Sequence, residues 1–142
     1  MKFRRIVALL VLLVCLGALP ALARPIVLKI GSPTPKGSPW DNALKELAVE
    51  WREITNGQVQ MRIFSGGIAG EEADVIRKMR FNSLQGAVLT ALGINKIYPD
   101  SFVLSVPFLM HSDDEFEYVL NNIEGNLKEN IEREGFRVVA WT

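Results

Sequence analysis

The stretch IVLKIGSPTPKGSPWDNALKELAVEWREITNG, residues 26–57, contains one complete unit of the predicted fold. Residues 26–30 are rich in Ile and Val, which predicts a short strand. The following residues include two prolines and two glycines and predict a loop. Ser38 suits a helix N-cap, with Pro39 at the first helical position. Apolar residues then recur at helical spacing, and an Asn-Gly pair ends the predicted helix.

The middle of the chain repeats this alternation of strand and helix. Residues 59–64 alternate apolar and polar side chains and predict a second strand. The tight loop SGGIAG, residues 65–70, follows and leads into a second amphipathic helix. Residues 86–90 predict a third short strand, and residues 91–98 predict a loop or a single helical turn.

The last part of the chain completes the pattern. Residues 102–110 are apolar but interrupted by a proline, which predicts an irregular extended segment. Ser112 and Glu115 form a capping box for a long helix, which Gly125 could divide in two. Residues 136–141 predict a last strand. This order of elements, without a linker, predicts one α/β domain with a largely parallel sheet flanked by helices.

The N-terminus has the three parts of a secretory signal peptide. Three basic residues precede an unbroken apolar run at residues 6–16, and an Ala-Leu-Ala signal ends at Ala23. The run is shorter than the roughly 20 residues that span a bilayer. We expect cleavage after Ala23, so that the working protein begins near Arg24 in the periplasm. An uncleaved N-terminal anchor is the alternative.

Composition excludes several classes of protein. Cleavage leaves 119 residues, enough for one core, with 13 basic and 16 acidic residues and a net charge of −3. This chain lacks the clustered Lys and Arg of a nucleic-acid-binding protein. It also lacks a further apolar stretch long enough to cross a membrane, so any association with the membrane is expected to be peripheral. The single cysteine, Cys15, lies within the signal, where Val14 disfavours lipidation because a lipobox has a small residue at that position.

The inventory of catalytic residues is small. His111 is the single histidine, and one histidine cannot form the usual multi-ligand metal site. Neither a Gly-x-Ser-x-Gly elbow nor a His-Glu-x-x-His pair occurs. The glycine loop has Ser65 where a dinucleotide fingerprint requires its first glycine. We therefore expect no metal and no cofactor, and we disfavour a secreted enzyme.

The expected binding site lies at the carboxyl ends of the strands, where open α/β sheets bind ligands. Residues 32–40, 65–70 and 90–95 form three such edges, which offer hydroxyl groups and an aromatic side chain. For Trp40, packing beneath the first helix is the alternative to a pocket wall, and for Phe108 it is a role in a crossover between halves of a protein. The candidate ligand-binding residues are Thr34, Ser38, Trp40, Ser65, Thr90, Ala91 and Phe108.

An ordered set of motifs resembles the solute-binding proteins of TRAP transporters, of the DctP type, over essentially all of residues 26–142. The motifs are LKIGSP at 28–33, PxGSxW at 35–40, TNGxV at 55–59, FSGGIAGE at 64–71, Pro99, VPFL at 106–109, EGF at 134–136 and Trp141.

The resemblance implies a type II periplasmic-binding-protein fold, in which two α/β lobes close around a small molecule, usually a carboxylate. It also implies that the protein is not an enzyme, and that it delivers its ligand to the membrane subunits of a sodium-coupled TRAP permease. Residues 24–142 would form the N-terminal lobe, incomplete at its C-terminus and without the second lobe.

Two departures from the family pattern affect the expected ligand. Residues 90–93, Thr-Ala-Leu-Gly, are uncharged where a sugar-acid pocket is more polar, which favours a less polar organic ligand. Members of the family are also two to three times longer than the mature chain, and the arginine that usually binds the ligand carboxylate lies beyond Thr142. The remaining hypotheses are a receptor of an ABC importer and a truncated lobe that acts as a protein-interaction module.

Overall fold

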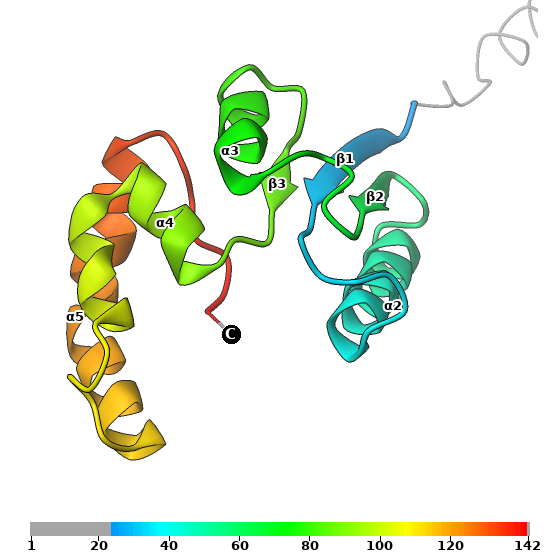
Figure 1. The fold of residues 1–142 in the computed structure, drawn as a ribbon. Coiled ribbons are helices and arrows are strands. Elements are labelled where there is room, and N and C mark those ends of the chain that lie inside the picture. Colours follow the sequence, from blue (N-terminus) through cyan, green and yellow to red (C-terminus); the bar gives the residue numbers. More distant parts are fainter. Residues whose placement is uncertain (1–23, 142) are drawn as a thin grey trace, which may run out of the picture.

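A parallel sheet forms the centre of the structure, a computed structural model that describes residues 24–141. Its three strands are β1 (Ile26–Gly31), β2 (Val59–Phe64) and β3 (Gly86–Ala87), in the order β2-β1-β3. Both pairings are parallel, with Ile26 opposite Val59 and Ile30 opposite Gly86. The predicted α/β class with a parallel sheet is confirmed (Figure 1). The predicted signal peptide lies outside the described residues.

Helix α2 (Pro39–Ile54) connects β1 to β2. The side chain of Ser38 accepts a hydrogen bond from the backbone N–H of Asp41, which confirms the predicted N-cap. The apolar face of α2 is only partly covered, since Trp40 is 55% exposed and Ile54 is 75% exposed. Trp40 therefore does not belong to the core of the described residues.

Helix α3 (Glu72–Arg80) connects β2 to β3 and covers the sheet. Val75 of this helix packs with Ala69 and Leu84 in one buried cluster, and Phe64 of β2 lies against it. On the next position of the helix, Ile76 belongs to a second cluster with Ile97 and Ile131. Because α3 contributes to both clusters, it joins the sheet to the C-terminal helices.

The C-terminal part is more helical than the sequence predicted. Its elements are α4 (Ala91–Ile97), the 3-10 helix η1 (Pro99–Ser105) and α5 (Asp113–Arg133). Residues 91–98, expected to form a loop or a single turn, contain α4, and η1 occupies part of the segment expected to be extended. Gly125 does not divide α5. Ser112 caps α5 as predicted, whereas Glu115 bonds the N–H of His111 rather than that of Ser112.

The predicted strand at residues 136–141 is wrong, because this segment carries no strand in the structure. Its apolar side chains are nevertheless partly buried: Phe136, Val138 and Trp141 pack on the cluster of Ile76, Ile97 and Ile131. The apolar character of this segment thus reflects burial against helices, which requires no ladder of hydrogen bonds. The third strand is likewise shorter than predicted, ending at Ala87 rather than residue 90.

Candidate functional site

Three loops follow the three parallel strands and meet at one edge of the sheet. Backbone hydrogen bonds join them: the N–H of Gly66 donates to the carbonyl of Thr34 at 2.8 Å, and the N–H of Gly67 donates to that of Ser32 at 3.1 Å. The N–H of Val88 donates to the carbonyl of Gly31 at 2.9 Å. The three sequence segments predicted to be neighbours are therefore neighbours in the fold.

The crevice of the sheet is expected between β1 and β3. The chain leaves β1 toward α2, on the β2 side of the sheet, and leaves β3 toward α4 on the other side (Figure 1). Adjacent strands whose connections diverge in this way define a switch point, where α/β proteins bind ligands. This geometry places Ser32 and Thr34 on one side of the candidate site and Thr90 on the other.

The first loop presents a pair of linked hydroxyl groups. The Oγ of Ser32 and the Oγ1 of Thr34 lie 2.7 Å apart, and the N–H of Thr34 donates to the Ser32 Oγ at 3.3 Å. Ser32 is 2% exposed, whereas Thr34 is half-buried. Ser32 therefore holds the orientation of the Thr34 hydroxyl, the more accessible of the two.

Asp41 holds the first two loops together from inside the protein. Its carboxylate is fully buried and accepts hydrogen bonds from the N–H of Gly37 at 2.6 Å, the Nζ of Lys45 at 2.6 Å and the hydroxyl of Ser65. The Gly37 N–H, and then Lys45 and Ser65, hold the pKa of Asp41 well below its usual range, against the opposing effect of burial. Asp41 is therefore a buried anion with every bond directed at a loop or at its own helix.

A second carboxylate joins α3 to the loop after β3. The Oε1 of Glu72 accepts from the N–H of Thr90 at 2.5 Å, and its Oε2 accepts from the Thr90 hydroxyl at 2.9 Å. The Thr90 hydroxyl also caps α4 by accepting from the N–H of Gly93. The edge at residues 90–93, uncharged in sequence, thus carries the charge of Glu72.

The candidate residues differ in how free they are to contact a ligand. Ser38 and Ser65 hold Asp41, and Thr90 holds Glu72, so their hydroxyls already have partners within the chain. Ala91, which follows Thr90, is exposed, as is Trp40 near the first loop. These residues belong to the three loops or to the helix turns that follow them.

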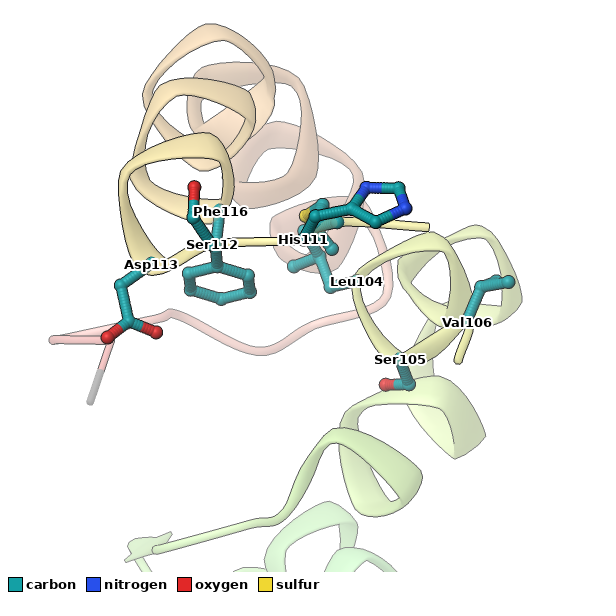
Figure 2. A pocket seen from close by; sticks show the side chains of 8 residues that line it. Leu104, Ser105, Val106, His111, Ser112, Asp113 and Phe116 are labelled. Atoms are coloured by element: carbon teal, nitrogen blue, oxygen red, sulfur yellow. The ribbon is translucent and has the colours of Figure 1, made fainter. Parts of the chain in front are cut away.

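Phe108 lies apart from this group, in the turn between η1 and α5. It is 92% exposed, and its φ of 63° is in the left-handed region, which a bulky side chain rarely adopts. A pocket lies beside this turn, between η1 and the start of α5 (Figure 2). Figure 2 shows Leu104 and Ser105 on the η1 side of the pocket and Phe116 on the α5 side. None of its lining residues comes from the three loops.

Sequence reasoning missed three residues of the site: Ser32, Asp41 and Glu72. Asp41 follows an N-cap serine by three residues, the spacing of a capping box, which gives it a local role without revealing Ser65 as its partner. Glu72 stands in the first turn of α3, where an acidic residue is expected on helix-dipole grounds alone. Their long-range partners depend on the parallel pairing of the strands.

Residues 24–141 contain no group of three or more His, Cys, Asp or Glu side chains that could hold a metal ion. Among these same residues, no helix combines the length and the apolar character needed to cross a bilayer.

Comparison with known proteins identifies one consistent set of similar sequences and folds. Residues 30–142 match the family described as bacterial extracellular solute-binding protein, family 7, or DctP. A solute-binding protein of Chromohalobacter salexigens is 26% identical over 108 residues, which are 75% of this chain and 32% of that protein.

Solved structures show the same fold. A TRAP periplasmic solute-binding protein of Desulfovibrio salexigens with bound orotic acid superposes with a TM-score of 0.72 at 22% identity, over 80% of this chain and 37% of that one. Another from Chromohalobacter salexigens, with bound D-glucuronate, gives a TM-score of 0.72 at 24% identity, over 80% of this chain and 38% of that one. The chain thus spans about a third of the length of the relatives that it matches.

Proposed function

Since the chain belongs to family 7 of the bacterial extracellular solute-binding proteins, we propose that it forms part of a periplasmic receptor for a small organic ligand. The ligand is a carboxylate or a less polar organic molecule, and the receptor delivers it to a sodium-coupled TRAP permease. The family consists of binding proteins and not of enzymes, which agrees with the small catalytic inventory of the sequence.

One observation carries the proposal: β1 and β3 are adjacent parallel strands whose connections diverge, and the loops that follow them present the hydroxyl groups of Thr34 and Thr90 at the switch point. Such groups fix the orientation of a polar ligand, while the walls of a small-molecule site are mostly apolar. Two relatives with this fold hold orotic acid and D-glucuronate, which are both small carboxylates. These ligands supply the class of compound to test.

The length of the chain limits how much of the ligand-binding site it can form. Because it spans 37% of the D. salexigens receptor, we propose that residues 24–142 provide one side of the ligand site. The second lobe, with the arginine that the family resemblance implies, would provide the other side. Signal cleavage after Ala23 and location in the periplasm are parts of the same proposal.

Thermal unfolding in the presence of candidate ligands tests the function. The panel contains orotate, D-glucuronate and the neutral sugar D-glucose, each at increasing concentration. A ligand at about 100 times its Kd stabilises the folded state by about 2.7 kcal/mol, so binding raises the Tm. Thr34→Val, which removes the accessible hydroxyl of the first loop, should reduce this rise.

Ser83→Ala is the matched control, because Ser83 is exposed and lies in the turn between α3 and β3, at the opposite edge of the sheet. Its ligand-dependent rise in Tm should equal that of the unchanged protein. Absence of any ligand-dependent stabilisation, in the chain alone and in a protein extended by the second lobe, would refute the proposed function.

A further inference from the structure

Glu72 occupies the hydrogen-bond donors of the third loop. Its two carboxylate oxygens bind the N–H and the hydroxyl of the same residue, Thr90, at 2.5 Å and 2.9 Å. This arrangement is bidentate, and hydrogen bonds to an ionised carboxylate are about twice as strong as neutral ones. The donors that this edge could offer to a ligand carboxylate are thus already used.

The backbone is shaped around this carboxylate. Gly93 is buried, and a Cβ atom placed on it would lie 2.7 Å from the Oε1 and the Cδ of Glu72. Real Cβ atoms do not approach other atoms so closely, so the absence of a side chain at Gly93 makes room for the Glu72 carboxylate. Two separate features, the bidentate contact and the space at Gly93, therefore fit a carboxylate at the same place.

The charge of Glu72 is not cancelled by a cation in the described part of the chain. Within residues 24–141, the ion pairs of the structure do not include Glu72, which is half-buried at the start of α3. A second anion near this edge would meet a like charge, which opposes binding. A group that donates a hydrogen bond would meet an acceptor.

We infer that Glu72 determines which ligand group the third loop accepts. Resting on the proposed function, the inference is that Glu72 excludes the ligand's carboxylate from the edge formed by residues 90–93. The ligand turns a hydrogen-bond donor toward this edge, such as a hydroxyl, an amide N–H or an ammonium group. Its carboxylate is bound elsewhere in the site. Glu72 is accordingly a specificity-determining residue of the receptor.

Acetate serves as the probe of the position that the Glu72 carboxylate occupies, once a substitution has removed that carboxylate. In Glu72→Ala the Thr90 donors become free, and acetate should bind there about tenfold or more tightly than to the unchanged protein. Titration with sodium acetate against sodium chloride at equal ionic strength, followed by amide NMR, should shift the Thr90 and Gly93 resonances in Glu72→Ala only. Glu71→Ala is the matched control, because Glu71 is exposed and makes no side-chain cap bond.

Equal acetate shifts in the unchanged protein and in Glu72→Ala would overturn the inference, and so would a folded Glu72→Ala that binds no acetate. If Glu72→Ala does not fold, the exchange of the Thr90 amide hydrogen with solvent is compared between the unchanged protein and Glu72→Gln. Because Glu72→Gln replaces a charged acceptor by a neutral one, the Thr90 amide hydrogen should exchange about tenfold faster in Glu72→Gln. An equal exchange rate in the two proteins contradicts the assignment.

The ligand panel separates this inference from the proposed function. Where a panel compound binds, Glu72→Gln should raise the affinity for D-glucuronate relative to D-glucose by about tenfold, because the like charge is removed. An unchanged ratio would overturn the inference while leaving the receptor function intact. Where no panel compound binds, the proposed function fails, and the acetate titration still decides whether Glu72 occupies the Thr90 donors.

Discussion

The hydroxyl of Ser65 donates a hydrogen bond to the buried carboxylate of Asp41, which joins two loops separated by 24 residues in the chain. Asp41 also accepts from the N–H of Gly37 in the first loop. The loops after β1 and β2 therefore share one anion as a common anchor. Since Thr34 also accepts a backbone bond from Gly66, the two loops are expected to move together when a ligand binds.

Loss of the Asp41 charge should destabilise the protein. Asp41→Asn places an amide group where three donors point at a carboxylate, and we expect the Tm to fall by about 5 °C or more. Asp74→Asn is the control, because the ion pair of Asp74 with Arg77 lies at the surface and should change the Tm by about 2 °C or less. Equal effects of the two variants would show that Asp41 does not anchor the loops.

The stability of the protein should fall at low pH because Asp41 becomes protonated. Its pKa in the folded state is depressed, mainly by the Gly37 N–H and then by Lys45, so the unfolded state binds the proton more readily. The stabilisation is complete above the ordinary carboxyl pKa and declines as the pH falls through that value toward the lower folded-state pKa.

Urea unfolding from about pH 7 to about pH 3 measures this dependence. Asp41→Asn should show a weaker loss of stability at low pH than the unchanged protein, since one linked proton is removed. Parallel curves for the two proteins would mean that other carboxylates produce the acid dependence.

Trp40 and Ile131 should respond differently to truncation. Ile131 is 2% exposed in the C-terminal cluster, so Ile131→Ala should cost about 2–5 kcal/mol of unfolding free energy. Trp40 is 55% exposed, and Trp40→Ala should cost less than that while reducing ligand affinity, if Trp40 forms a wall of the site. Urea unfolding and ligand titration of both variants provide the comparison. A larger loss of stability for Trp40→Ala would place Trp40 in the core.

Phe108→Asn should stabilise the protein by about 1 kcal/mol, because asparagine tolerates the left-handed backbone better than phenylalanine does. Little apolar contact is lost, since the Phe108 side chain is 92% exposed. Phe102→Asn is the control: Phe102 is 45% exposed in η1 and is not left-handed, so this change should not stabilise.

Ligand titration of Phe108→Asn also tests the sequence-based hypothesis that Phe108 contacts the ligand. Weaker binding would support that role. Unchanged binding together with higher stability would leave Phe108 as a residue of the turn alone.

The fold was predictable from sequence where an element depends on residues that are near one another in the chain. The strand at residues 26–30, the Ser38 cap and the Ser112 cap depend on neighbouring residues, and all three are present. The absence of the last strand was not predictable, because the apolar side chains of Phe136, Val138 and Trp141 meet α3, α4 and α5 and not a neighbouring strand. A pattern of burial does not distinguish a sheet partner from a helical one.

The candidate site was predictable as a set of loops but not as a set of contacts. Parallel strands bring their carboxyl ends to one edge, so the hydroxyls of Thr34 and Thr90 could be assigned to it from sequence. The partners of Asp41 and Glu72 could not, because each carboxylate reaches a residue 18 or more positions away. Which distant residue each carboxylate reaches depends on how the helices and strands pack against one another.

Sequence alone determined the alternation of strands and helices, the caps of α2 and α5, and the family resemblance, because these depend on residue order and on short-range chemistry. Tertiary structure decided that Asp41 would anchor two loops and that Glu72 would fill the donors of Thr90. The physical reason is that a carboxylate removed from water must find donors, and the fold determines which donors are near. Residues 90–93 carry no charge themselves, so the negative charge at the third loop arises only when the chain folds and brings Glu72 to it.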